Sequence, residues 1–245
     1  SVGFIRECRF LHAPRNLLSL STFVSGTGFL ISSEVFDYKK GWNYNTISED
    51  YQLTCDKVIK GTRVAYCDDA IFYDEQPTTL KQTYRQRLRW QKGCYIIFGM
   101  FLGNLLFKMF NTLKFTFFDF IVHLGPIPLC STSWALFNGL WAFIECVVKI
   151  IAGEPFALTV GLLLLSLLKF FALLYLGFFI YGSLSVLKDW KRIKTTNKKK
   201  ILSMLAYPIF MISLIPIPFI SLFKKIEWKP IKHSSSKTVS DIEKQ

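Results

Sequence analysis

The hydrophobic pattern of the chain changes near residue 92. Before that point, short runs rich in β-branched and aromatic residues, at 21–24, 63–67 and 70–73, alternate with polar segments that contain helix caps and glycine stops. Beyond it the chain is mostly apolar, in runs long enough to cross a bilayer. The pattern predicts part of an α/β domain over residues 1–92, followed by an α-helical transmembrane region.

The apolar half divides into several segments. Residues 93–112 are interrupted by glycine, asparagine and lysine, which favours a helix that lies in the membrane interface. Prolines interrupt the last apolar segment, which therefore either spans the membrane or forms a re-entrant hairpin, the arrangement we favour. A polar tail follows over residues 224–245. The region 113–223 is predicted to hold transmembrane helices at about 116–150, 156–187 and 201–223.

The net charge supports a membrane location. The 245-residue chain is 51% hydrophobic and carries a formal charge of +13, with basic clusters near residues 81–92, 188–200 and 224–225. Because each cluster flanks an apolar run, the charge is typical of membrane anchoring and not of nucleic-acid binding. The positive-inside rule puts the loop 188–200, and with it residues 1–92, in the cytoplasm. We expect a multi-pass protein of the cell membrane, with membrane lipids and no nucleic acid among its partners.

The short acidic segment Ser48-Glu49-Asp50 lies at the start of a predicted helix. A serine cap followed by acids that complement the helix dipole is a common structural arrangement. A carboxylate in this position could also act as a general base that deprotonates an acceptor hydroxyl. The residues alone leave both interpretations open.

A second candidate is the helix face formed by Gln86, Arg89 and Trp90. These residues lie at i, i+3 and i+4 of a predicted helix that a capping box at residues 79–82 opens. An amide, a guanidinium and an indole on one face suit a ligand that is part phosphate and part sugar. The same face could equally belong to a basic amphipathic helix on anionic lipid, with Trp90 as an interfacial aromatic residue.

The remaining polar features carry weaker signals. The loop Gly26-Thr27-Gly28 is typical of a turn, although it could also let the backbone approach a sugar closely. The acidic pairs at 68–69 and 74–75 are better explained as solvated turn residues than as metal ligands. The cysteines form no CxxC pair and the histidines are widely spaced, so no zinc site is predicted.

These motifs, in their order along the chain, resemble those of one family. Ser-Gly-Thr-Gly at 25–28, Ser-Glu-Asp at 48–50, Pro-Thr-Thr at 77–79 and Gln-x-x-Arg-Trp at 86–90, followed by Gly93, precede the membrane helices. This set is similar to the membrane-embedded family 2 glycosyltransferases, which include cellulose synthase, hyaluronan synthase and bacterial poly-N-acetylglucosamine synthase. The stretch 73–79 and the tail segment 228–233 add to the likeness with the bacterial members.

The resemblance implies a fold and a set of site residues. Residues 1–92 would form the C-terminal half of a GT-A-like catalytic domain on the cytoplasmic side. Asp50 matches the catalytic base of the family, and Ser48 stands where threonine is usual. The residues matched to substrate binding are Glu49, Gln86, Arg89, Trp90, Gly26 and Thr27.

The resemblance also implies a reaction. The family transfers a sugar, with inversion, from a nucleotide-sugar donor to a growing glycan or lipid acceptor. UDP-N-acetylglucosamine and UDP-glucose are the first candidate donors here, and transfer is expected to be processive. Members hold a divalent metal, Mg or Mn, with an Asp-x-Asp motif that this chain lacks. We therefore expect the chain to be the C-terminal part of a longer enzyme, inactive alone, whose metal ligands lie elsewhere.

A non-catalytic role is the alternative interpretation. A membrane scaffold or transport subunit with a basic lipid-binding helix would account for the charge and for the apolar runs. It would not account for the ordered polar motifs.

Overall fold

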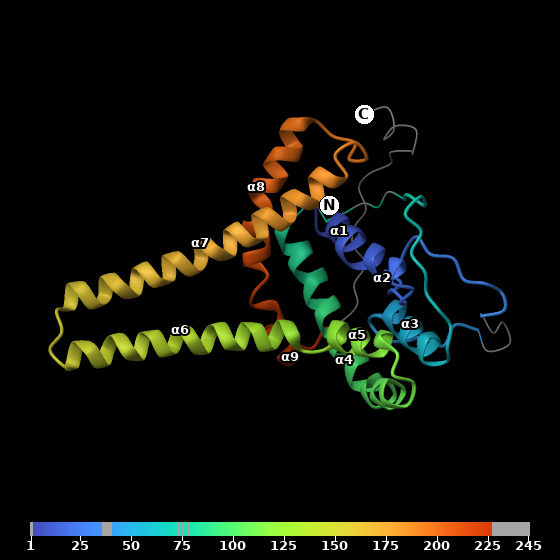
Figure 1. The fold of residues 1–245 in the computed structure, drawn as a ribbon, viewed down its shortest axis with the longest axis horizontal. Coiled ribbons are helices and arrows are strands. Elements are labelled where there is room, and N and C mark those ends of the chain that lie inside the picture. The colour runs from blue at the N-terminus through green and yellow to red at the C-terminus, as the bar shows by residue number, and fades with distance from the viewer. Residues whose placement is uncertain (1, 36–40, 73, 75, 78, 227–245) are drawn as a thin grey trace. The chain divides into compact units, whose positions relative to one another are not determined.

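A computed structural model of the chain describes residues 2–35, 41–72, 74, 76–77 and 79–226. It divides into two compact units, whose helices are labelled in Figure 1. The first unit comprises residues 3–127 together with the chain from residue 217 onward, and the second comprises residues 128–216. Several residues used in the sequence comparison lie outside the described residues: 73, 75 and 78, and the tail from 227 to 245.

Helices form the framework of the first unit. The N-terminal run consists of α1 (Val2–Glu7), the π-helical turn η1 (Cys8–His12) and α2 (Ala13–Leu17). The next helices along the chain are α3 (Glu49–Ile59) and the long α4 (Leu80–Thr112). The remaining helices of this unit are α5 (Phe115–Leu124) and α9 (Ile217–Phe223).

The prediction of an α/β, GT-A-like half-domain over residues 1–92 is wrong for this structure. No strand or sheet occurs in the described residues, where the segments predicted as strands have no regular secondary structure. One backbone hydrogen bond, from Thr22 N to Val64 O at 2.9 Å, joins two of them. An isolated bridge between Ser25 and Thr27 is the β-type pairing among these residues.

Side chains occupy the backbone groups that a sheet would need. The N–H of Val64 donates to Ser21 Oγ at 3.3 Å, and that of Val24 donates to Thr54 Oγ1 at 3.1 Å. The N–H of Tyr66 donates to Asn16 Oδ1 at 3.3 Å. Residues with high β propensity suit a partly buried segment whether or not it pairs with a strand. Here the side-chain partners satisfy backbone N–H groups that would otherwise need a neighbouring strand.

An apolar core joins the helices of the first unit. Phe23, which follows α2 in the chain, stacks on Phe120 of α5 with ring centroids 4.1 Å apart. Around this pair, α3, α4 and α5 contribute residues that are almost completely shielded from solvent: Cys55, Val58, Ile97, Leu105, Phe117 and Leu124. The core therefore fixes α3 and α5 against the middle of α4.

The start of α3 packs against α4 through a glycine. α3 begins at Glu49, so Ser48 occupies the predicted cap position, but its side chain makes no capping hydrogen bond. It lies instead against Gly93, where an added Cβ would stand 1.8 Å from Ser48 Oγ. Only the absence of a side chain at position 93 permits this approach.

The helix α4 is continuous from the polar into the apolar part of the chain. Thr79 caps it, as the sequence predicted, by accepting a hydrogen bond from Gln82 N at 3.3 Å. The predicted domain boundary at residues 92–93 falls inside this helix. On α4, Lys92 donates from Nζ to Leu222 O of α9 at 2.9 Å. The interfacial placement of residues 93–112 remains a prediction.

The second unit consists of long helices joined by short loops. It contains most of α6 (Ile127–Ile151), α7 (Phe156–Lys188) and α8 (Asn197–Ser213). Tyr175 of α7 donates its hydroxyl to Leu205 O of α8 at 3.0 Å. Lys200 is buried and donates from Nζ to Trp190 O at 2.6 Å, which holds the loop between α7 and α8 against the start of α8.

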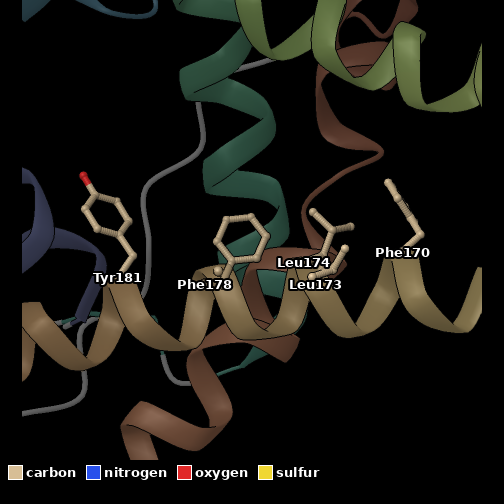
Figure 2. A pocket seen from close by; sticks show the side chains of 6 residues that line it. Phe170, Leu173, Leu174, Phe178 and Tyr181 are labelled. Atoms are coloured by element: carbon tan, nitrogen blue, oxygen red, sulfur yellow. The ribbon is translucent and has the colours of Figure 1, made fainter.

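Four helical segments of the described chain are long and apolar enough to cross a membrane: Leu80–Thr112, Ile127–Ile151, Phe156–Lys188 and Asn197–Phe223. Their apolar side chains are largely exposed in the isolated chain. Figure 2 shows part of one such surface, with Phe170, Leu173, Leu174, Phe178 and Tyr181 along α7. Exposed apolar surface of this length is what a membrane protein presents to lipid. The cytoplasmic side of residues 1–92 and the path of residues 201–223 remain predictions.

We expect Gly93→Ala to destabilise the first unit. The new methyl group would overlap Ser48, so α3 and α4 would have to separate at a cost of about 1–3 kcal/mol. The thermal midpoint of the detergent-solubilised protein should fall by several degrees. Gly99→Ala is the matched control, because Gly99 lies on the same helix with nothing within 4 Å of an added Cβ. Equal midpoints for the two variants would contradict the packing argument.

Candidate functional site

Asp50 lies in the first turn of α3, beside the glycine loop. Its Oδ1 accepts a hydrogen bond from the backbone N–H of Tyr51 at 2.8 Å. On its other side, a Cβ added to Gly26 would stand 3.4 Å from Oδ2. Gly26 has a φ of 77°, in the left-handed region, so the loop reaches the carboxylate by a backbone conformation that favours glycine. Two predicted site residues, Asp50 and Gly26, are thus neighbours in space.

The surroundings of Asp50 make its carboxyl group unusually basic. Burial raises the pKa of Asp50 to about 6, against the opposing hydrogen bond from Tyr51 N–H. The neighbouring charge of Glu49 raises this pKa further, and the charge of Arg89 lowers it. A carboxyl group with this pKa is mostly ionised at neutral pH, yet it accepts a proton more readily than an exposed aspartate does.

Arg89 connects α4 with the residues that precede α3. Its Nη1 donates to Ile47 O at 2.9 Å, one residue before Ser48. This bond and the approach of Ser48 to Gly93 hold the start of α3 at two points one turn apart on α4. The structure therefore brings Asp50 and Arg89 together, as the candidate site requires.

The other predicted residues of the α4 face have different neighbours. Trp90 packs edge-on against Phe4 of α1, with ring centroids 6.0 Å apart, and the Arg87 guanidinium lies 4.7 Å from the centroid of its ring. Gln86 is half-buried one turn earlier on the same helix. In the described chain no hydrogen bond joins Gln86, Trp90 or the exposed Thr27 to Asp50. Asp50, Glu49, Arg89 and Gly26 form the part of the predicted site that the fold assembles.

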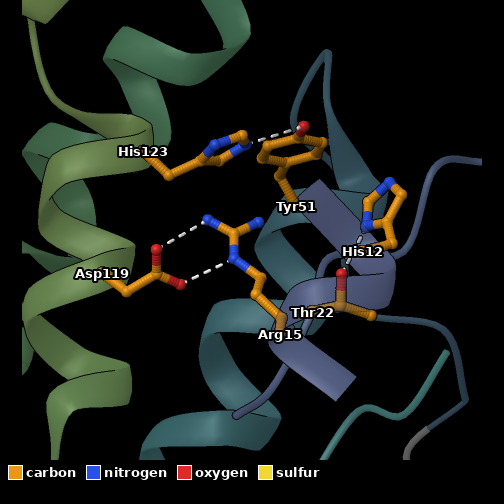
Figure 3. Close-up of polar contacts among 6 residues, drawn as sticks. All are labelled: His12, Arg15, Thr22, Tyr51, Asp119 and His123. Carbon is orange, nitrogen blue, oxygen red and sulfur yellow. Dashed lines mark hydrogen bonds and ion pairs between the residues drawn. The ribbon is translucent and has the colours of Figure 1, made fainter. Parts of the chain in front are cut away.

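Sequence reasoning missed a polar cluster behind Asp50, shown in Figure 3. Arg15 of α2 is almost fully buried and makes a two-pronged ion pair with Asp119 of α5, at 2.7 and 3.0 Å. On the same helix, His123 Nε2 lies 3.3 Å from the hydroxyl of Tyr51. His12 bonds through Nδ1 to the hydroxyl of Thr22. We call these six residues the polar cluster.

One sequence signal could have indicated this cluster. Asp119 stands in the apolar run Phe115–Leu124, and a carboxylate in such surroundings needs a basic partner. The partner is 104 positions away in the chain, so periodicity could not identify it. Asp119 and His123 are four residues apart and share a face of α5, which is the remaining local clue.

The described residues do not fit a divalent metal. They contain no group of three or more His, Cys, Asp or Glu side chains placed to hold an ion. Magnesium and manganese need several oxygen ligands at fixed positions, and Asp50 and Glu49 do not provide such a set.

Comparison with known proteins gives two matches. A family model described as Glycosyl transferase family group 2 matches residues 9–186. The "Probable glycosyltransferase YdaM" of Bacillus subtilis (strain 168) is 29% identical over 110 residues, covering 42% of this chain and 26% of that protein. The matched part thus spans about a quarter of the relative's length. No solved structure matches the chain significantly.

We expect Asp50→Asn to stabilise the fold at neutral pH. The pKa of Asp50 in the folded chain, about 6, lies above its ordinary value of 3.8, so the folded state binds the proton more tightly than the unfolded state. The contribution of Asp50 to stability is therefore greatest at low pH and falls as the pH rises between these two values. The neutral variant should melt several degrees above the parent at pH 7.5, and the difference should vanish near pH 4.

Asp56→Asn, on the same helix, is the control, and the change that we expect in its melting temperature has the opposite sign. Although burial raises the pKa of Asp56, hydrogen bonds with Lys60 and Tyr44 hold it below its usual value. Folding therefore favours ionised Asp56, and its removal should lower the melting temperature at pH 7.5. A fall in both variants would contradict the assignment of Asp50 as a buried, basic carboxylate.

Proposed function

We propose a reaction for this chain, which belongs to the glycosyl transferase family group 2. The reaction is an inverting transfer of a sugar from a nucleotide-sugar donor to a growing glycan or lipid acceptor at the membrane. UDP-N-acetylglucosamine and UDP-glucose are the donors we propose to test first, and we propose that the transfer is processive. The observation that carries the proposal is the half-buried carboxylate of Asp50, of raised pKa, beside Arg89 and the Gly26 loop.

Asp50 is the general base in this proposal. As the acceptor hydroxyl oxygen attacks the anomeric carbon of the donor sugar, its proton passes to the Asp50 carboxylate. A new glycosidic bond forms on one face of the sugar while the bond to the nucleoside diphosphate breaks on the opposite face, which inverts the anomeric configuration. The leaving diphosphate carries the displaced electron pair. The pKa of about 6 keeps Asp50 ionised before the reaction and able to accept the proton during it.

Arg89 and Trp90 have binding roles in the same proposal. The guanidinium of Arg89 is a fixed positive charge near Asp50 that can attract a phosphate group. Trp90 offers an aromatic face to a sugar ring, supported by its packing against Phe4. Gln86, Glu49 and Thr27 complete the proposed substrate-binding set. The apolar helices support a membrane-embedded enzyme whose catalytic part, we propose, faces the cytoplasm.

Asp50→Asn tests the base directly. In membranes that contain the protein together with any segment needed for activity, transfer of labelled sugar should fall by about a hundredfold or more. The kcat of the parent should decline as the pH falls through about 6, because protonated Asp50 cannot accept the proton. Asp56→Asn should keep the parental kcat, since Asp56 points to Lys60 and Tyr44. Transfer by Asp50→Asn at the parental rate would refute the assignment.

Trp90→Ala separates substrate binding from lipid anchoring. If Trp90 covers a sugar, the KM for the acceptor should rise about fivefold to tenfold while membrane association is unchanged. Trp134→Ala, at an exposed position on α6, is the control and should leave the KM as in the parent. Membrane association is measured by alkaline extraction and kinetics by product formation. Loss of membrane association with an unchanged KM would instead support the lipid-binding helix.

A further inference from the structure

Two pairs of polar residues join α5 to the surroundings of Asp50. Asp119 binds Arg15, and His123, one helical turn further on, contacts Tyr51, the residue that follows Asp50 (Figure 3). The two α5 side chains that make these contacts lie on the same face of the helix. Helix α5 thus contacts α2 and α3 directly, although Asp119 lies 104 positions after Arg15 and His123 lies 72 positions after Tyr51.

Tyr51 contacts both Asp50 and His123 of α5. Its backbone N–H donates to Asp50 Oδ1, so the orientation of the carboxylate depends on the backbone at residue 51. Its ring stacks on Phe23 at 4.7 Å, and its hydroxyl lies 3.3 Å from His123 Nε2. With the ring held on one side and the hydroxyl on the other, Tyr51 has little freedom to rotate.

The Arg15–Asp119 pair fixes the position of α5 relative to α2. Arg15 is about 96% buried, and Asp119 is its ion-pair partner among the described residues. Because a buried guanidinium without a counter-charge is strongly unfavourable, the pair resists any sliding of α5. Arg15 also lies 5.3 Å from the centroid of the Phe23 ring, which stacks on Tyr51. The two pairs therefore meet at Phe23.

We propose that Asp119 and His123 of α5 are positioning residues that hold Asp50, through Arg15 and Tyr51, in the orientation needed for proton transfer. The proposal rests on the proposed function, in which Asp50 is the base. α5 follows α4 and precedes α6, two candidate membrane spans, in the chain.

The test is a double-mutant cycle on Tyr51 and His123 in membranes that contain the active protein. Tyr51→Phe and His123→Phe keep both rings but remove the hydroxyl–imidazole contact. Each should lower kcat about tenfold, with the KM for the donor within twofold of the parent, because a misplaced base affects the transition state alone. The double variant should fall no further, because both substitutions remove the same contact.

The pH profile gives a readout that a purely structural role would not change. The groups that face Asp50 are Glu49 and Tyr51 of α3, and Arg89 and Cys94 of α4. None of them changes in the His123→Phe variant, so a shift in the apparent pKa of kcat there reports a reoriented carboxylate. Tyr175→Phe, which removes a hydroxyl–backbone bond in the second unit, should leave the profile and kcat as in the parent.

The outcomes separate the two proposals. If the Asp50→Asn variant is inactive while the folded His123→Phe variant keeps the parental kcat, the positioning role is overturned and the assignment of Asp50 as the base stands. Additive losses in the double variant would also overturn the positioning role. Active Asp50→Asn would refute the proposed function itself. The ion pair is tested by comparing two variants at position 119. Asp119→Glu keeps the charge and should keep most of the kcat, whereas Asp119→Asn should lose it. If Asp119→Asn fails to fold, the double-mutant cycle on Tyr51 and His123 still tests the positioning role.

Discussion

Ser48 lies so close to Gly93 that no other residue could stand at position 93 without moving one of the two helices. This approach sets where α3 begins, and it leaves the Ser48 hydroxyl without the capping role its position suggests. One turn earlier on α4, Arg89 binds the carbonyl of Ile47. The first turn of α3, which carries Asp50, is thereby fixed on a rigid helix that continues into the apolar part of the chain. A loop alone could not hold a carboxylate so firmly.

Burial then determines the chemistry of that first turn. A helix N-terminus normally favours ionised acids, and Tyr51 N–H and the charge of Arg89 act in the same direction. Desolvation outweighs both and raises the pKa of Asp50 to about 6. Burial of Asp50 therefore lowers the stability of the fold at neutral pH and makes the carboxylate more basic, a combination that functional sites commonly show.

The sequence predicts local features better than pairing between distant segments. The Thr79 cap and the helical spacing of Gln86, Arg89 and Trp90 follow from neighbouring residues, and α4 has both. The expected strands failed because side chains such as Ser21 and Thr54 occupy their backbone N–H groups, and hydrophobic patterning does not reveal such bonds. Trp90 lies against Phe4, a contact between residues far apart in the sequence. The Arg15–Asp119 pair escaped notice for the same reason.

The missed pair also joins an apolar helix, α5, to the part of the first unit that carries Asp50. A buried arginine could have been replaced by an apolar residue at little cost to stability, since buried ion pairs contribute little net free energy. What such a pair adds is specificity, because the buried Arg15 guanidinium has its counter-charge only when Asp119 is in place. Asp119 and His123 share one face of α5, so the register that satisfies Arg15 also brings His123 to Tyr51. Stability alone would need neither pair, whereas a base that α5 holds in one orientation would need both.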